Sequence, residues 1–348
     1  MKEVNMKKHF LPLLALLLCL CCMPFAEAAG STVIVALGDS YTSGEGNEPY
    51  YGQDLPMEER CLNQDWLAHR SEINWPGMLT LPAVDGPMKD HRGTNWFFAS
   101  ASGARSEHMF LLTDEEKAAG MSAEQEKKYN RDGVSGTTML VPQLDIFDEL
   151  DAKGLKADYV LLTVGGNDIG FPTLVTMGIT GGLAYQPGNT PEEKAASLFQ
   201  TWYTDKGIRA NITRALSDIA ARAGSQACII LAGYPQLLTG EGSEGGFSAE
   251  SSQIMNAAGN LMEEELRSIV EECREKGINI HFVSVAEAFE GHEAYSDDPY
   301  VNPVTILAGP QDLNAFSMVN MVSMHPNKKG VEAYARCVQA LIDELEAE

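Results

Sequence analysis

The chain has 348 residues, of which 25 are basic (Lys and Arg) and 49 are acidic (Asp and Glu), so its formal net charge is −24. Its 44% content of apolar residues is enough for a substantial core and excludes a disordered polyelectrolyte. The acidic balance argues against nucleic acid as a partner, because binding phosphates requires clustered Lys and Arg. It also argues against docking on an anionic lipid surface through charge, although a lipid can still be a substrate.

The N-terminus has the pattern of a secretory signal peptide. Lysines at positions 2, 7 and 8 precede an apolar run from Phe10 to Phe25, and Ala26-Glu27-Ala28 fits the small-x-small pattern of a cleavage site. We therefore expect residues 1–28 to be removed and the protein to be secreted, periplasmic or held at the cell surface. An uncleaved anchor is the alternative, but the run is short for a membrane span. No stable membrane insertion is expected after cleavage.

Four cysteines remain after residue 28: Cys61, Cys228, Cys273 and Cys337. Export permits disulfides, but this number does not make the dense framework of a disulfide-stabilised domain. No pair has the C-x-x-C spacing that is typical of a zinc site. We expect buried free thiols and no metal.

Short apolar runs alternate with amphipathic segments along the rest of the chain. In chain order, they predict strands at 32–37 and 96–99, a helix at 143–153, a strand at 159–164, a helix at 208–222, a strand at 228–232, the longest helix at 251–276, a strand at 280–285, and a last helix that starts at Pro326. This alternation implies a parallel sheet that is covered by helices on both faces.

Four stretches interrupt the alternation and are predicted to be insertions: residues 48–95, 112–137, 173–205 and 239–250. The first two are mostly polar, and the last is rich in Gly, Ser and Glu, which predicts a mobile loop. The sequence contains no internal repeat and no linker that would divide it. Residues 29–348 are therefore expected to form one domain with insertions.

Polar residues and glycines gather where the predicted strands end, which is where parallel sheets place their functional sites. Ser40 follows the first strand, and a nearby base would make its hydroxyl a nucleophile. His325 precedes the last helix and can lie over the same edge of the sheet. Gly103 and Asn167 follow the second and third strands, and they offer a main-chain N–H and a side-chain amide to an oxyanion. Each residue alone is common in turns and caps, but the four in this order favour an ester-cleaving serine.

The motifs around these residues resemble those of the GDSL/SGNH hydrolases, a family of esterases and lipases, from about residue 32 to residue 345. The matching blocks are Gly38-Asp39-Ser40-Tyr41, the glycine Gly103, Gly165-Gly166-Asn167-Asp168, and the histidine His325. The chain is most similar to secreted bacterial members that begin Gly-Asp-Ser-Tyr-Thr-Ser-Gly. Those members also tend to carry motifs similar to Cys61 with His69-Arg70-Ser71, and to Gly291-His292-Glu293.

The resemblance implies a flavodoxin-like three-layer α/β/α sandwich with a central parallel sheet, and no metal or organic cofactor. Ser40 would be the nucleophile and His325 the general base. The N–H groups of Ser40 and Gly103 and the side chain of Asn167 would form the oxyanion hole. We expect Asp39 and Asp168 to fix turns rather than transfer protons, and the protein to be a monomer.

The sequence departs from the family at one position. Most members carry an aspartate three residues before the histidine, and this chain has Val322 there. Some of the closer secreted relatives use a main-chain carbonyl at that position. We therefore predict a Ser40–His325 dyad in which the Val322 carbonyl accepts the imidazole Nδ1–H. The alternative is a distant acid: Asp297, Asp298 or Asp312.

Two further motifs have open assignments. His69 and Arg70 either anchor the first insertion or bind a carboxylate or phosphate of the substrate. His292 is expected to brace a loop near the site.

Three functions fit these residues. The first is a secreted serine esterase or lipase that hydrolyses a small-molecule or lipid ester through an acyl-enzyme. The second is a deacetylase of acylated polysaccharide or cell-wall sugars, which would use the same site. An apolar groove in 173–205 would favour the first, and an open polar cleft the second. The third is a catalytically silent surface binding module, against which the complete set of four site residues argues.

Overall fold

A computed structural model describes residues 32–121, 125–129, 136–204, 207–243, 246–305 and 320–347. The predicted signal peptide and Asp312 lie outside the described residues, as do parts of the predicted insertions 112–137, 173–205 and 239–250. Residues Thr32–Glu348 cluster as one compact unit.

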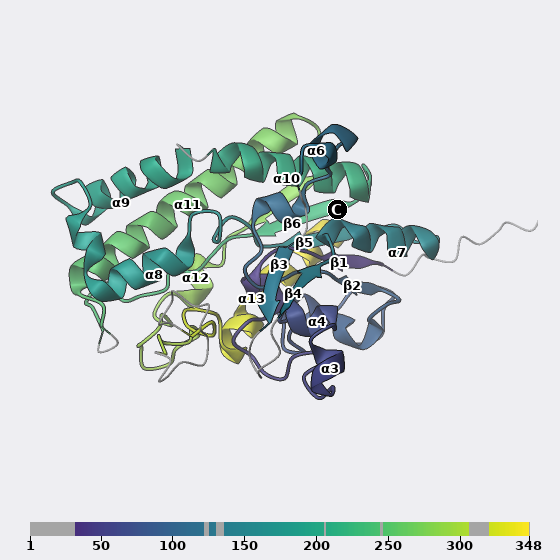
Figure 1. The fold of residues 1–348 in the computed structure, drawn as a ribbon, viewed down its shortest axis with the longest axis horizontal. Coiled ribbons are helices and arrows are strands. Elements are labelled where there is room, and N and C mark those ends of the chain that lie inside the picture. Colours follow the sequence, from purple (N-terminus) through teal and green to yellow (C-terminus); the bar gives the residue numbers. More distant parts are fainter. Residues whose placement is uncertain are drawn as a thin grey trace, which may run out of the picture. The chain divides into compact units, whose positions relative to one another are not determined.

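Five parallel strands form the central sheet, in the order β2–β1–β5–β6–β7 (Figure 1). Their bounds are Ile34–Ala36 for β1, Trp96–Phe98 for β2, Tyr159–Leu162 for β5, Cys228–Ala232 for β6 and Ile280–Val283 for β7. All five predicted strands are present, four of them shorter than predicted. Numbered along the chain the order is 2-1-3-4-5, which is the flavodoxin-like arrangement. It places the reversal of strand order between β1 and β5. Open parallel sheets in general bind their ligands at the carboxyl ends of the strands at such a reversal.

The sheet is buried on both faces because apolar residues occupy both sides of each strand. Val35, Val160 and Ile229 pack with the helices of one face, whereas Ile34, Leu161 and Ile230 pack with those of the other. The first face is covered by α7 (Ile146–Ala152), α10 (Ile208–Ala223) and the C-terminal half of α11 (Ala249–Glu275), and the second by α5 (Trp75–Met78) and α13 (Lys328–Ala347). The predicted three-layer arrangement is therefore present.

The predicted helices match α10 and α11 to within two residues at each end. In place of the helix predicted over residues 143–153, the structure has a 3₁₀ turn, η3 (Gln143–Asp145), followed by α7. The prediction that the last helix starts at Pro326 is wrong, because the first residue of α13 is Lys328. Asn327 explains the difference: its side-chain oxygen accepts from the N–H groups of Lys329 (2.9 Å) and Gly330 (3.2 Å) and so caps the helix.

The remaining elements are short and lie mostly in the predicted insertions. They are α2 (Ser40–Ser43), α3 (Met57–Arg60), α4 (Gln64–Leu67), η1 (Met88–His91), η2 (Ser106–Met109), α6 (Asp114–Ala118), the antiparallel pair β3 (Gln125–Tyr129) and β4 (Gly136–Leu140), α8 (Phe171–Thr180), η4 (Gly182–Tyr185), α9 (Pro191–Phe199), the π-helix η5 (Gln200–Thr204) and α12 (Ala286–Phe289). Figure 1 shows α8 and α9 beside the N-terminal half of α11. The third insertion therefore forms a helical wall next to the strand ends.

Cys61, Cys228, Cys273 and Cys337 are all free; Cys228 and Cys273 are buried, and the other two are half-buried. Among the described residues, no helix is both long enough and apolar enough to span a membrane. The same residues contain no group of three or more His, Cys, Asp or Glu side chains that could hold a metal ion.

Candidate active site

The turn after β1 presents Ser40 at the strand reversal point. Gly38 has a φ of +105°, and a Cβ atom there would lie 2.3 Å from the Thr163 carbonyl oxygen, so only glycine lets the ends of β1 and β5 come this close. Asp39 caps α2, its side chain accepting from the Tyr41 N–H at 3.0 Å. Ser40 is thereby fixed as the first residue of α2 and is only 6% exposed.

Ser40 is in direct contact with His325. Nε2 of the histidine lies 2.7 Å from Oγ of the serine, and the ring is buried. Two residues that are 285 positions apart in the sequence therefore meet, as the motifs predicted. A serine hydroxyl at hydrogen-bond distance from an imidazole is the arrangement of an activated nucleophile.

The predicted partner of the imidazole Nδ1 is wrong by one residue. Nδ1 lies 3.0 Å from the main-chain oxygen of Ser323, whereas the Val322 carbonyl accepts from the His325 main-chain N–H at 3.4 Å. The reason is the turn at Met324, which has a φ of +60°. Its buried side chain and a 2.6 Å hydrogen bond from the Tyr41 hydroxyl to its carbonyl hold this left-handed conformation, which leaves the Ser323 carbonyl facing the ring.

The distant acids do not take this position within the described structure. Asp298 pairs with Lys329, and its carboxylate lies 3.7 Å from Nδ1 of His292. Asp297 is exposed, whereas His325 is buried. Asp312 lies outside the described residues. The dyad with a main-chain carbonyl is therefore the arrangement that the described residues support.

Burial lowers the pKa of His325 below its ordinary value, because the charged imidazolium loses its hydration. The negative charge of Glu45 and the Ser323 carbonyl act in the opposite direction and offset part of this effect. At neutral pH the imidazole is therefore uncharged and can accept a proton from Ser40.

The other two predicted site residues lie on loops that are tied together. The side-chain amide of Asn167, after β5, donates to the Ala104 carbonyl at 2.9 Å, so it joins the residue that follows Gly103. Gly103 has a φ of +81° and is exposed. Asp168 accepts from the Ser106 N–H at 3.1 Å and from its hydroxyl, which fixes the same two loops. These contacts place both candidate oxyanion donors at one end of the sheet.

Asp39 is buried in a hydrogen-bond network that the motifs alone did not indicate. Its carboxylate accepts from the Thr163 hydroxyl at 2.6 Å and from the Tyr234 hydroxyl. The Tyr234 oxygen in turn accepts from the Gly166 N–H at 3.1 Å. Burial raises the pKa of Asp39 to about 6, although these hydrogen bonds partly oppose the shift. The position of Tyr234 two residues after the end of β6 was the available sequence signal for its role.

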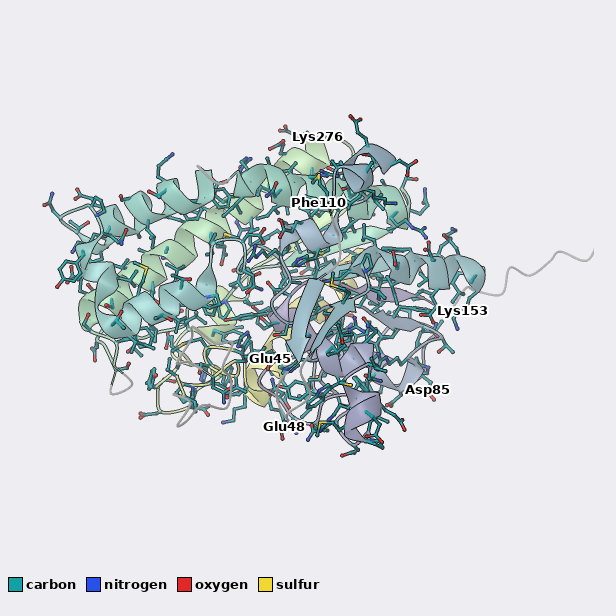
Figure 2. The ribbon with its side chains drawn as sticks, viewed as in Figure 1. Glu45, Glu48, Asp85, Phe110, Lys153 and Lys276 are labelled. Carbon is teal, nitrogen blue, oxygen red and sulfur yellow. The ribbon has the colours of Figure 1, made fainter. Side chains whose placement is uncertain are left out.

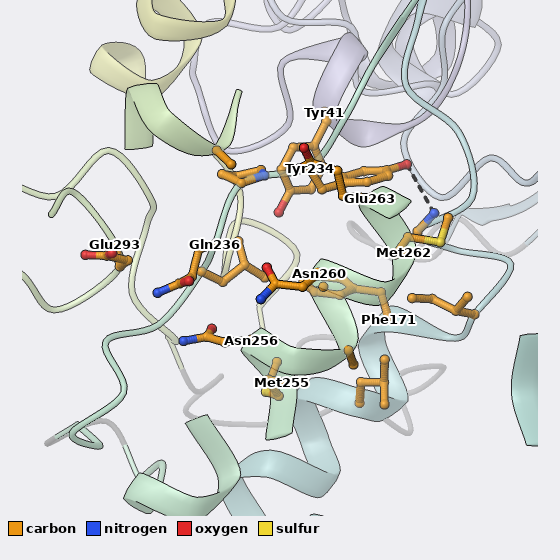
Figure 3. A pocket seen from close by; sticks show the side chains of 18 of the residues that line it. Tyr41, Phe171, Tyr234, Gln236, Met255, Asn256, Asn260, Met262, Glu263 and Glu293 are labelled. Carbon is orange, nitrogen blue, oxygen red and sulfur yellow. Dashed lines mark hydrogen bonds between the residues drawn. The ribbon is translucent and has the colours of Figure 1, made fainter. Parts of the chain in front are cut away.

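A cavity of about 540 Å³ is lined by Ser40, Asn167 and residues of α11. Figure 3 shows side chains that line it, among them Asn256 and Asn260 of α11. Its apolar lining comes from α8, η4, α9 and α11 and includes Phe171, Leu174, Leu183, Leu198, Ile254 and Met255. Its polar lining includes Gln236, Asn256, Asn260 and the carboxylates Glu263, Glu287, Glu290 and Glu293. Four of the six apolar residues named belong to the predicted insertion 173–205 or to the residues directly before it.

The structure locates the two motifs whose roles the sequence left open, His69-Arg70 and His292. Arg70 is buried and donates to the main-chain oxygens of Ser100 (2.9 Å) and Ala99 (3.0 Å), so it anchors the first insertion to the end of β2. His69 lies against the buried carboxylate of Glu45. His292 stacks on Tyr300 with ring centres 3.8 Å apart, which matches the expected role of bracing a loop.

Comparisons with known proteins address the sequence and the fold of the chain. No family model matches the sequence. The chain is 26% identical over 278 residues to a lipase of Streptomyces rimosus, covering 79% of this chain and 78% of the lipase. The crystal structure of the extracellular lipase of Streptomyces rimosus superposes with a TM-score of 0.56 and 22% identity, covering 89% of this chain and 99% of the lipase.

A second solved structure, phospholipase A1 from Streptomyces albidoflavus NA297, gives a TM-score of 0.55 at 17% identity and covers 89% of this chain and 99% of the phospholipase. These two likenesses establish the fold, and the lipase relative extends the likeness to the sequence. The chain therefore has the fold of these two enzymes and is similar in sequence to a lipase, and Ser40, Asn167 and His325 lie at the strand ends, where the resemblance to the GDSL/SGNH hydrolases implies them to be.

Proposed function

We propose that the protein is a secreted serine esterase or lipase that cleaves esters of apolar acyl chains through an acyl-enzyme on Ser40. The observation that carries the proposal is the 2.7 Å contact between Ser40 Oγ and His325 Nε2 at the end of a cavity with an apolar wall. An acyl chain in that cavity removes apolar surface from water on both partners, whereas a sugar would leave its hydroxyl groups against the wall. The signal-peptide pattern and the extracellular lipase relative support secretion.

In the proposed reaction, Nε2 of His325 takes the proton of Ser40 as Oγ attacks the ester carbonyl carbon. The Ser323 carbonyl accepts the Nδ1–H, and this keeps the lone pair on Nε2. The imidazolium then gives its proton to the departing alcohol oxygen, and the acyl group stays on Oγ. Nε2 next takes a proton from water, whose oxygen attacks the acyl-enzyme, and the acid leaves as Ser40 regains its proton.

The oxyanion that forms in both steps would be bound by the N–H groups of Ser40 and Gly103 and by the side chain of Asn167. The side chain of Asn167 donates one amide hydrogen to the Ala104 carbonyl, and its second amide hydrogen can be donated to the substrate. A donor of this kind contributes about 10²–10³ in kcat, so Asn167→Ala should reduce turnover by about that factor.

Hydrolysis of p-nitrophenyl esters from acetate to palmitate, by the wild type and by Ser40→Ala, tests the proposal. We expect Ser40-dependent turnover whose kcat/KM rises with chain length until the cavity is filled. Ser217→Ala, on α10, controls for the loss of a hydroxyl elsewhere in the fold. A strong preference for acetate would instead assign the protein to the sugar deacetylases, and a folded protein without Ser40-dependent turnover would favour the silent binding module.

A further inference from the structure

Glu45 is a buried carboxylate that the dyad and the oxyanion hole do not use. It follows α2 in the loop Gly44-Glu45-Gly46-Asn47 and is only 1% exposed. Its neighbour Glu48 is exposed (Figure 2). Burying a carboxylate is costly unless charged or hydrogen-bonding partners surround it, so a carboxylate retained beside a nucleophile calls for an explanation.

The partners of Glu45 come from three segments of the chain. The Tyr50 hydroxyl donates to Oε1 at 2.9 Å, and Nδ1 of His69 lies 3.0 Å from Oε2. The Ser102 hydroxyl, beside Gly103, is a further hydrogen-bond partner. Burial opposes ionisation, but these partners outweigh it and hold the pKa of Glu45 well below its ordinary value. Glu45 is therefore a permanent negative charge at neutral pH.

The first insertion builds this environment. His69 has a φ of +50°, and its ring packs against those of Tyr50 and Trp66, with centre distances of 5.1 Å and 5.8 Å. The next residue, Arg70, fastens the segment to the end of β2. The His-Arg motif thus brings a histidine against Glu45 and does not place it in the substrate cavity, whose lining contains neither residue.

The loop that carries Glu45 lies directly along the segment that carries His325. The Glu45 N–H donates to the Ser40 carbonyl at 3.0 Å, and the Asn47 side chain donates to the Pro326 carbonyl at 2.8 Å. A Cβ atom on Gly46 would lie 3.4 Å from Cβ of His325. Glu45 is therefore held next to both members of the dyad by its own main chain.

Few other titratable groups face the imidazole in the described structure. Tyr41, from α2, has its ring centre 5.2 Å from that of His325, and burial raises its pKa far above its ordinary value, so it stays neutral. Asp39 directs its carboxylate to Thr163 and Tyr234. Glu45 is the carboxylate whose charge acts on His325.

We propose that Glu45 is a positioning residue for ester hydrolysis, whose buried charge stabilises the His325 imidazolium while the Ser323 carbonyl holds Nδ1. This inference rests on the proposed function. The two tasks that one aspartate performs in most serine hydrolases, orientation and charge, are then divided between two groups. Glu45 gains and loses no proton; its field favours the transition state because positive charge appears on His325 as Ser40 gives up its proton.

Glu45→Gln tests the proposal because it removes the charge and keeps the size of the side chain. We expect kcat for ester hydrolysis to fall about tenfold, KM to stay unchanged, and the acid limb of the kcat/KM profile to move down by about one pH unit. Glu48→Gln removes the same charge from an exposed position three residues away, and its profile should match the wild type.

Glu45→Gln leaves His69 without its charged partner, which can destabilise the fold. The double variant Glu45→Gln/His69→Gln removes both members of the pair, and we expect it to show the same displaced acid limb. A wild-type kcat and acid limb in either folded variant would reduce Glu45 to a structural residue and overturn the proposal.

An NMR titration of the His325 imidazole in the same variants provides a readout that needs no turnover. We expect its pKa to fall in Glu45→Gln and in the double variant, and to stay unchanged in Glu48→Gln. If the wild type hydrolyses no ester, the proposed function fails while this titration still decides whether the charge of Glu45 acts on His325. An imidazole pKa that does not respond to Glu45→Gln contradicts the inference directly.

Discussion

The main-chain oxygen of Ser323 lies 3.0 Å from Nδ1 of His325, in the place that a carboxylate takes in a Ser-His-Asp triad. A carbonyl can fix the tautomer of the ring, but it carries no net charge. The side chain at this position is then free to vary, because the main chain provides the contact. The identity of Val322 and of Ser323 should therefore matter little for catalysis.

We expect Val322→Ala and Ser323→Ala to retain kcat/KM within about threefold of the wild type, which is less than about 1 kcal/mol of transition-state stabilisation. His325→Ala should lose about 10²–10⁴ in rate, because the general base is gone. Ser323→Ala should also lower the free energy of unfolding by about 1 kcal/mol, since the Ser323 hydroxyl accepts from the Thr305 N–H at 2.9 Å. Ester hydrolysis and urea unfolding measure these effects.

Asp298→Asn is the matched test of the alternative acid. The Asp298 carboxylate pairs with Lys329 and not with His325, so the turnover of Asp298→Asn should equal that of the wild type. A loss as large as that of His325→Ala, in a folded protein, would show that a carboxylate orients the imidazole after all.

Local patterns predicted the sheet and most of the geometry of the candidate site for physical reasons. Strands such as β1 and β5 are buried on both faces, so their sequences are continuous apolar runs that are easy to recognise. Ser40 and Asn167 lie just after predicted strands, His325 lies just before the predicted last helix, and the parallel topology brings these three positions together. The last helix was placed two residues too early because Pro326 and Asn327 are both typical of helix starts, and only the hydrogen bonds of Asn327 distinguish them.

Features that depend on contacts between distant segments could not be predicted. The choice of Ser323 instead of Val322 is set by the left-handed turn at Met324, which a hydrogen bond from Tyr41 supports. Glu45 is one of many acidic residues in the sequence, and its burial appears only when His69 and Tyr50 pack against it. The apolar wall of the cavity likewise requires two helices of an insertion to pack on α11.

The buried carboxyl of Asp39 should make the protein less stable as the pH rises from about 4 to about 6. Its pKa is about 6 in the folded state and 3.8 ordinarily, so the folded state binds the proton more tightly and loses that advantage above both values. Between pH 4 and pH 7, the free energy of unfolding of the wild type should fall by roughly 2 kcal/mol relative to that of Asp39→Asn.

Urea unfolding at several pH values measures this difference. The contributions of the other carboxylates to the pH dependence cancel, because both proteins contain them. Asp85→Asn, at an exposed carboxylate, is the control for removing one acid. A difference between wild type and Asp39→Asn that stays constant from pH 4 to pH 7 would mean that Asp39 titrates normally in the folded protein.

Ala258 offers a direct test of what the cavity binds. It lies on α11, is 7% exposed and lines the cavity among larger apolar side chains. Ala258→Phe would fill space that an acyl chain needs while leaving Ser40 and His325 in place. We expect hydrolysis of the acetate ester to stay near the wild-type rate and hydrolysis of long-chain esters to fall. The loss should grow with the number of methylene groups that no longer fit in the cavity, because each buried methylene contributes about 0.8 kcal/mol.

Glu264→Phe places the same side chain at an exposed position of the same helix and should leave the chain-length profile unchanged. If Ala258→Phe lowers acetate and palmitate hydrolysis by the same factor, the substitution disturbs the dyad rather than the acyl site. If it alters neither ester, the acyl chain lies elsewhere, and the polar side chains Gln236, Asn256 and Asn260 would point to the cavity as the site of the alcohol part of the substrate.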